Sequence, residues 1–246
     1  IVLETLGIEI TETDDNYLDL IEKKFGSGFP KTDVFSAFAR ATLPEISSLD
    51  NPDEAFIAWI DREEMLFRTL ERRLVSERLR EGFVKGGHID VDGFVILALK
   101  IINRRKARAG LALEHHLEYI FQEHHILYSR GKTTENKSKP DFIFPNIEEY
   151  HDVAFPQSRL TMLGVKSTCK DRWRQVLTEA ERIKKKHLFT LETGISLNQT
   201  KEMQSHNLQL VLPKGLHKTY KAEQIAWLLN LQDFLELVKA RQTPKH

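Results

Sequence analysis

The feature that most constrains the fold of this chain is a change of rhythm near His125. From there on, short apolar segments alternate with segments whose apolar residues recur at helical spacing. The candidate strands are Ile126–Ser129, Asp141–Pro145, Leu160–Ser167, His187–Glu192 and Leu208–Leu212, and the candidate helices are Asp171–Lys185, Leu197–His206 and Leu231–Arg241. Strands that alternate with helices predict an α/β fold with helices on both faces of a mixed central β-sheet.

The first part of the chain differs, because it reads as helices alone. Asn51-Pro52-Asp53-Glu54 opens the longest helix with a capping residue, a proline in the first turn and early acids. Gly86-Gly87 then breaks the pattern. Two further helices are expected at about 90–103 and 111–123. We therefore expect a helical N-terminal portion at 1–87 and an α/β core at 88–246.

Lys+Arg and Asp+Glu both count 36, so the net charge is zero and gives no information about a nucleic-acid partner. The distribution is more informative. One run without an acid contains Lys100, Arg104, Arg105, Lys106 and Arg108, and a second contains Arg182 to Lys186. A locally basic face on a neutral chain can follow DNA phosphates. The alternative, a solvated helix end, explains most such runs.

The single cysteine, Cys169, excludes a disulfide framework and a cysteine-rich zinc site. It suits a reducing cytoplasm. The sequence has no signal-peptide pattern and no apolar run long enough to span a bilayer, so we expect a cytoplasmic protein without a membrane partner. The pairs His115-His116 and His124-His125 have no third ligand cluster at zinc spacing, which favours surface or packing histidines.

Two charged residues next to predicted strands carry the chemistry. Lys139-Pro140-Asp141 places a carboxylate at the start of one apolar strand, and the next strand ends in Lys166. Buried strands rarely contain an ammonium group without a partner. Such a pair belongs to metal-dependent phosphodiesterases, in which a carboxylate binds a hard divalent cation and the lysine orients or deprotonates the attacking water. The pattern alone is a weak signal.

The usual nuclease pattern has a second acid two residues before the lysine, but Gly164 stands there. Glu179 can replace that acid. On a helix that starts near Asp171, Glu179 lies on the stripe away from Trp173 and Val176, two turns in, from where it can lean back over the strand end. The alternative is a solvent-exposed glutamate.

The triplet Lys170-Asp171-Arg172 suggests base reading. Lysine or arginine pairs with O6 and N7 of guanine, and aspartate accepts from N4 of cytosine. A cation-acid-cation run at a helix start could therefore read adjacent G·C pairs in the major groove. The alternative is an N-cap aspartate between solvated cations.

With these residues in view, the stretch KPDFIFPNIEEYHDVAFPQSRLTMLGVKSTCKDRWRQVLTEAERI, followed by KHLFTLETGISL, resembles the catalytic domain of the EcoRII-type restriction endonucleases. The likeness is dense from about Lys139 to Leu197 and thinner through NRRKARAG, LEHHLEYIF and LPKGLHKTY. This family is a branch of the PD-(D/E)XK nucleases in which the second metal-binding acid has moved onto the following helix, so Gly164 is in keeping with it.

The resemblance implies a type II restriction endonuclease that cuts double-stranded DNA at a CCNGG or CCWGG site with Mg²⁺. It implies a homodimer, with dimerisation and DNA contacts in the helical portion, and a companion DNA methyltransferase for the same site. By the resemblance Asp141, Lys166 and Glu179 are catalytic, and Asp141 and Glu179 bind the metal. Tyr150 lies beside the centre, and Glu114 supplies a further active-site acid.

The resemblance also assigns DNA contacts. Lys170, Asp171 and Arg172 would contact the C·C/G·G half-site, and Trp59 would stack on a central base flipped out of the duplex. Trp59 has an alternative as an ordinary core residue beside Phe56.

Two other functions remain open. One is a nuclease of the same fold that recognises a junction or damaged DNA, and the other is a catalytically silent DNA-binding module.

Overall fold

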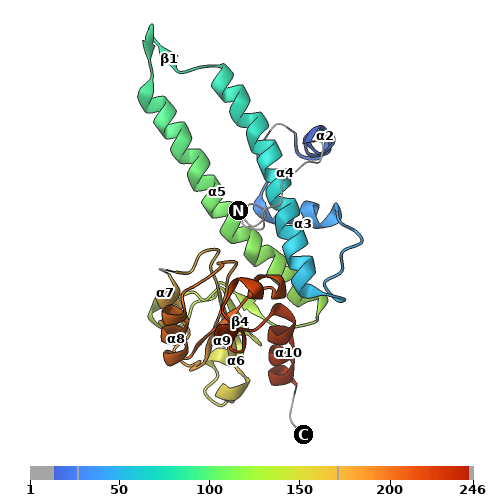
Figure 1. Ribbon diagram of the computed structural model, residues 1–246, viewed down its shortest axis with the longest axis vertical. Helices are drawn as coiled ribbons and strands as arrows, with labels where there is room; N and C mark the ends of the chain where they lie inside the picture. Colours follow the sequence, from blue (N-terminus) through green and yellow to red (C-terminus); the bar gives the residue numbers. More distant parts are fainter. Residues whose placement is uncertain (1–13, 27, 171, 244–246) are drawn as a thin grey trace. The chain divides into compact units, whose positions relative to one another are not determined.

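The computed structural model describes residues 14–26, 28–170 and 172–243 (Figure 1). The chain forms two compact units. One comprises the described residues up to Glu45 together with Ala58–His115, and the other comprises Ile46–Ile57 and His116 onward. This division differs from the expected boundary after Gly87, which stays a prediction. Among the helices of the described ranges, none has an apolar stretch long enough to cross a membrane.

The unit that begins at Ile46 contains a five-stranded sheet in the order β3-β4-β5-β6-β7. Its strands are β3 (Ser129–Arg130), β4 (Phe142–Phe144), β5 (Thr161–Val165), β6 (Lys186–Phe189) and β7 (Leu208–Val211). The β3/β4 and β4/β5 pairs are antiparallel, whereas β5/β6 and β6/β7 are parallel. The predicted mixed sheet is therefore confirmed, with each strand inside or beside its expected segment.

Side chains that alternate along β4 build a hydrophobic layer on each face of the sheet. Ile143 packs in one cluster with Trp173 and Val176. Phe142 and Phe144 instead contact the ring of Phe121, with centroids 5.1 Å away in each case. Because successive side chains of a strand point to opposite faces, the sheet is covered on both sides.

Short helices surround this sheet. They are α6 (Ile147–His151), α7 (Trp173–Leu177), α8 (Leu197–Ser205), α9 (Ala222–Ile225) and α10 (Leu231–Gln242), with 3₁₀ turns η1 (Glu135–Lys137), η2 (Gln157–Arg159) and η3 (Lys214–Thr219). Asn146, Ser196 and Asn230 cap α6, α8 and α10 through their side-chain oxygens. Asp53 accepts the backbone N–H groups of Lys214 and Leu231, both at 2.8 Å, and so ties two distant loops together.

The other unit is helical. Its elements are α2 (Asp14–Phe25), α3 (Thr32–Ala41), most of α4 (Pro52–Arg80), the short hairpin of β1 (Val84–Lys85) and β2 (His88–Ile89), and most of α5 (Val91–Glu123). Phe35, Phe38 and Leu66 are buried in its core. Figure 1 shows α4 and α5 side by side, joined by the β1–β2 hairpin.

Two helix predictions are wrong in extent. The two helices expected at about 90–103 and 111–123 are one continuous α5, because Gly110 adopts helical backbone within it. The helix expected at Asp171–Lys185 is only α7, which ends at Leu177. Ala180 has a φ of 47° just beyond, a left-handed conformation that no α-helix continues through.

Candidate active site

Asp141 and Lys166 lie together because β4 and β5 are antiparallel neighbours, so the start of one strand meets the end of the other. Lys166 Nζ donates to Asp141 Oδ2 at 2.9 Å. The backbone N–H of Val165 donates to the same oxygen at 2.6 Å. The two side chains are only 13% and 18% exposed. The geometry thus presents one carboxylate and one ammonium at the edge of the sheet.

Glu179 completes this cluster from the turn after α7 rather than from a long helix. Burial raises the pKa of its carboxyl to about 7; the charge of Lys166 opposes this shift, and that of Asp141 adds to it. Glu179 Oε2 is buried and accepts no hydrogen bond within the described part of the chain. A buried carboxylate oxygen without a donor is costly unless another ligand satisfies it.

Gly164 explains why the second acid comes from this turn. A Cβ at Gly164 would lie 3.0 Å from Val176 Cγ2, so a side chain there would fit only if Val176 shifted. The absence of a side chain lets α7 pack closely on β5, and α7 leads directly into Glu179. A carboxylate at 164 would therefore compete with Val176 of α7 for the same space.

Lys186, the first residue of β6, fixes the turn that contains Glu179. This lysine is only 6% exposed. Its ammonium donates to the backbone oxygens of Ala180 at 2.9 Å and Ile183 at 3.1 Å, and also to that of Glu179. Burial lowers the pKa of Lys186, and the charge of Glu179 opposes that shift. The side chain of Lys186 therefore binds the backbone carbonyls of the turn and adds a positive charge beside the cluster.

The cluster fits a divalent cation by its chemistry. Two carboxylates interact unfavourably in a partly buried site, and one of them has an oxygen without a donor. Mg²⁺ prefers oxygen ligands and keeps several waters, so one or two carboxylates are a sufficient protein contribution. In the described ranges there is no group of three or more His, Cys, Asp or Glu residues placed to bind a metal. By their chemistry, Asp141 and Glu179 are the residues of this cluster that could hold a divalent cation, and their role as metal ligands stays a prediction.

Tyr150 lies close to the Glu179 turn. The tyrosine is 1% exposed, and its hydroxyl donates to Glu135 Oε2 at 2.5 Å and accepts the Arg182 N–H at 3.3 Å. Burial, together with the bond to Glu135, raises its pKa. These bonds suit a residue that orders the turn. Glu114 is partly buried on α5, in the helical unit, and its active-site assignment stays a prediction.

Of the proposed reading triplet, Asp171 lies outside the described residues. Lys170 is half exposed, and its ammonium lies 3.4 Å from Glu192 Oε1. Arg172 is exposed and precedes α7, with its N–H donating to the carbonyl of Cys169 at 3.0 Å. Both cations are accessible to a ligand, and their role in reading bases stays a prediction.

The basic run on α5 divides into two kinds of residue. Arg105 is paired with Glu71 at 2.5 Å, and Arg104 lies over the ring of Phe29 at 3.9 Å. Arg108 is buried beside Phe35. Lys100 and Lys106 are exposed. These two lysines are therefore the better candidates for contacts with DNA phosphates.

Trp59 is 2% exposed on α4, and the guanidinium of Arg40 lies 6.0 Å from its ring centre. This placement agrees with the core alternative raised from the sequence. Stacking on a flipped base, which stays a prediction, would require the indole to become accessible.

Sequence reasoning missed Lys186 as a site residue. The signal that singled out Lys166, a lysine beside an apolar strand, was present at Lys186 as well. Glu192 was also missed, because it lies in a loop and its partners Cys169 and Lys170 are distant in sequence.

Comparison with known proteins identifies the family. Residues 67–235 match the family described as EcoRII C terminal. The chain is 39% identical to the type II restriction enzyme EcoRII of Escherichia coli over 230 residues, which are 93% of this chain and 55% of that protein. It therefore spans about half the length of this relative.

Two solved structures share the fold. One is metal-depleted Ecl18kI in complex with uncleaved DNA, with a TM-score of 0.66 and 19% identity over 96% of this chain and 88% of that chain. The other is a complex of the restriction endonuclease PspGI with substrate DNA, with a TM-score of 0.70 and 14% identity over 95% of this chain and 97% of that chain. These matches confirm the restriction-endonuclease-like fold expected from the sequence. The chain belongs to the EcoRII C-terminal family.

Proposed function

We propose that this chain is the catalytic part of a type II restriction endonuclease, which hydrolyses one phosphodiester bond in each strand of double-stranded DNA at a specific site. The observation that carries the proposal is the contact of Lys166 with Asp141 beside a partly buried glutamate, Glu179, that has a buried oxygen without a donor. The EcoRII relative, named a type II restriction enzyme, supports the same reaction class.

Each residue has a distinct part in this reaction. Mg²⁺, when bound by Asp141 and Glu179, would polarise the scissile phosphate and lower the pKa of a water molecule. Asp141 orients Lys166 through their hydrogen bond, and the ammonium of Lys166 directs the attacking water, whose proton passes to bulk solvent as the water attacks. Lys186 holds Glu179 in place through the backbone of its turn.

The proposed substrate is a duplex with a CCNGG or CCWGG site. The solved relatives Ecl18kI and PspGI are both complexes with DNA, which supports a duplex as the ligand. Arg172 and Lys170 would read the G·C pairs, and Lys100 and Lys106 would contact phosphates. A DNA methyltransferase with the same specificity would protect the host genome.

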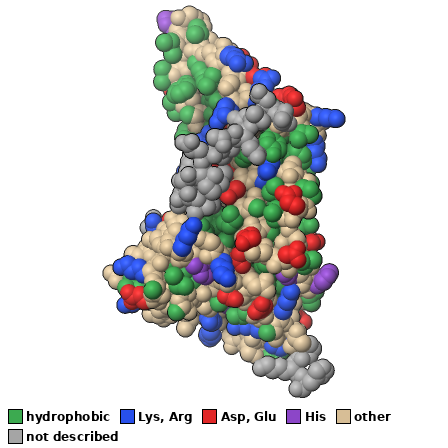
Figure 2. All heavy atoms as spheres, turned by 45° about the vertical axis from the view of Figure 1, so that its right-hand side comes forward, with side chains coloured by type: hydrophobic (Ala, Val, Ile, Leu, Met, Phe, Trp, Pro, Cys, Tyr) green, Lys and Arg blue, Asp and Glu red, His purple; other side chains and the backbone are tan. Residues whose placement is uncertain are grey.

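We also propose a homodimer, because a nearly palindromic site has two related halves and each half would be contacted by one of two symmetry-related subunits. The helical unit supplies a surface for it. Figure 2 shows hydrophobic side chains gathered over the end of the α4–α5 hairpin, at the top of the view. This hairpin-end surface comprises the exposed side chains of Leu79, Val84, Ile89, Val91, Phe94, Val95, Ile96, Leu99 and Ile102. Monomeric proteins rarely expose so many adjacent apolar side chains.

Digestion of a plasmid of known sequence tests the activity and the specificity together. We expect Mg²⁺-dependent fragments with staggered ends at the outer edge of CCNGG-like sites. Lys166→Ala should abolish cleavage but keep site-specific binding in Ca²⁺, because its ammonium acts on the water and not on base edges. Lys184→Ala, which removes an exposed lysine of the same unit, is the matched control.

Three results would count against the proposal. Near-normal turnover by Lys166→Ala would remove the active-site assignment. Cleavage only of junctions or damaged duplexes would favour a nuclease with structural specificity. Site-specific binding without cleavage by the wild type would favour a silent DNA-binding module.

A further inference from the structure

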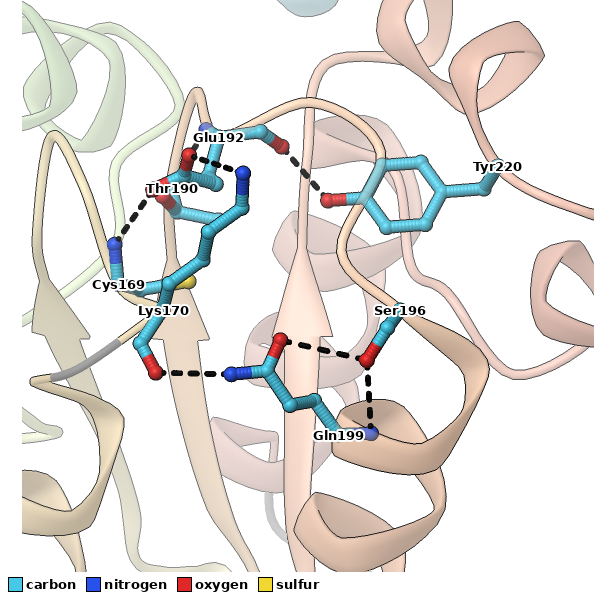
Figure 3. A network of polar contacts seen from close by, with 7 residues as sticks. All are labelled: Cys169, Lys170, Thr190, Glu192, Ser196, Gln199 and Tyr220. Atoms are coloured by element: carbon cyan, nitrogen blue, oxygen red, sulfur yellow. Dashed lines mark hydrogen bonds and ion pairs between the residues drawn. The ribbon is translucent and has the colours of Figure 1, made fainter.

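A network of polar contacts holds the backbone of Cys169 and Lys170, and Glu192 lies at the centre of this network (Figure 3). Glu192 lies in the loop after β6, whereas Lys170 lies in the loop after β5. Because β5 and β6 are parallel neighbours, their carboxyl ends meet at one edge of the sheet, and the two loops come together there.

The carboxylate of Glu192 contacts two successive residues. Its Oε2 accepts the backbone N–H of Cys169 at 3.0 Å, and its Oε1 lies 3.4 Å from Lys170 Nζ. The glutamate side chain is 15% exposed, whereas that of Lys170 is 50% exposed. A largely buried acid thus anchors the backbone and directs a cation whose other side faces solvent.

Glu192 is itself fixed through its own backbone. Its N–H donates to Thr190 Oγ1 at 3.1 Å, and its carbonyl accepts from the Tyr220 hydroxyl at 2.6 Å. Thr190 is fully buried and Tyr220 nearly so. The orientation of the carboxylate is therefore set before any ligand binds.

A second contact holds Lys170 from α8. Gln199 Nε2 donates to the backbone carbonyl of Lys170 at 3.0 Å, and Ser196 accepts the Gln199 N–H at 3.3 Å. The Cys169–Lys170 segment begins with the N–H of Cys169, which Glu192 accepts, and ends with the carbonyl of Lys170, to which Gln199 donates. Side chains from other parts of the fold therefore hold both ends of this segment.

We propose that Glu192 is a positioning residue for sequence discrimination. It holds the Cys169–Lys170 backbone and directs the Lys170 ammonium. The ammonium therefore contacts the edge of one base and does not bind a neighbouring DNA phosphate instead. Its negative charge also weakens attraction to DNA of arbitrary sequence. This inference rests on the proposed function, because it assumes that Lys170 faces the G·C half-site.

The test compares the dissociation constants, in Ca²⁺, of the whole chain for a cognate duplex, a duplex with one half-site G·C pair exchanged, and a random duplex. Glu192→Ala removes the backbone acceptor and the charge. We expect its preference for the cognate over the exchanged duplex to fall about tenfold, within the range that one base contact contributes. Its affinity for random DNA should rise.

Glu192→Gln separates the two effects. The amide oxygen can still accept the Cys169 N–H, but the amide NH2 group then faces the Lys170 ammonium and no longer attracts it. This variant should therefore lose less cognate preference than Glu192→Ala, while binding random DNA more tightly. Glu202→Ala is the matched control, because Glu202 is an acid of the same unit paired with Arg174 at 2.6 Å and without a contact to Lys170 within the described ranges.

The outcomes distinguish this inference from the function on which it rests. Unchanged cognate preference in Glu192→Ala, with a site-specific wild type, would overturn the positioning role alone. An equal loss in Glu202→Ala would also overturn it. A wild type that binds every duplex equally would instead overturn the proposed function. If Glu192→Ala does not fold, unchanged random-DNA affinity in Glu192→Gln would refute the proposal.

Discussion

Replacing Glu179 by glutamine should stabilise the metal-free protein, and should do so only at neutral and higher pH. In the unfolded chain this carboxyl has its ordinary pKa of 4.5, whereas burial raises the pKa to about 7 in the folded state. As the pH rises between these values, the unfolded chain releases a proton that the folded chain retains. The stability of the wild type therefore falls through this window, and glutamine, which does not titrate, removes the loss.

The size of the effect follows from that difference in pKa. A rise from 4.5 to about 7 corresponds to about 3 kcal/mol for a fully buried group, since one pKa unit is about 1.4 kcal/mol. Glu179 is only partly buried, so solvent screening reduces this value to about 1–2 kcal/mol. For a chain of 246 residues, the melting temperature would then rise by about 3–6 °C.

Thermal melting of both proteins in EDTA, at several pH values from 5 to 8, measures this effect. The advantage of Glu179→Gln should be small at pH 5 and should reach its maximum near pH 8. Glu181→Gln is the control, because it makes the same substitution at an exposed neighbour, which accepts from Asn136 at 2.7 Å. An advantage of the same size at pH 5 and pH 8 would refute the reasoning. Mg²⁺ should stabilise the wild type more at pH 8 than at pH 6, since it competes with the proton on Glu179.

Four further predictions concern DNA binding and assembly. Arg172→Ala should cost about 1–3 kcal/mol of discrimination between the cognate and a G·C-exchanged duplex; equal losses on cognate and random DNA would make Arg172 a phosphate contact. Lys106→Ala should weaken binding to all duplexes and reduce the salt slope by about one, which a salt titration measures, and a loss confined to the cognate site would contradict this. A cognate duplex with 2-aminopurine at its centre should brighten when the protein binds in Ca²⁺, and Trp59→Ala should alter that signal without unfolding the chain; an unchanged signal or an unfolded variant would leave Trp59 in the core. Leu99→Asp, within the hairpin-end surface, should shift the mass measured by light scattering from dimer to monomer, and a dimer of unchanged stability would move the interface elsewhere.

The sheet and the meeting of Asp141 with Lys166 could be predicted from the sequence because they depend on local patterns. Asp141 and Lys166 each stand next to a short apolar strand, and consecutive strands are usually neighbours. The residue pair is therefore placed correctly without any knowledge of distant contacts. The pair alone indicated metal-dependent phosphodiesterase chemistry only weakly, and the family resemblance made the assignment to a restriction endonuclease specific.

The turn that contains Glu179 could not be predicted by helical periodicity. The spacing of Trp173, Val176 and Ala180 continues a helix on paper, but the chain leaves the helix at Thr178. The ammonium of Lys186 binds the carbonyl groups that a longer helix would have used internally. Such a tertiary contact has no signature in a local window. The same reason applies to Arg105 and Arg108, whose partners lie on other helices or their connecting loops.

The close packing of α7 on Gly164 also limits which single substitutions the chain can accept at position 164. A substitution of Gly164 by aspartate or glutamate would place an acid where the usual nuclease pattern has one, yet its Cβ would lie 3.0 Å from Val176 Cγ2. The new side chain would compete with that of Val176, on α7, for the same space. Positions 164 and 176 are therefore coupled, and an acid on β5 is expected to be tolerated best together with a smaller residue at 176.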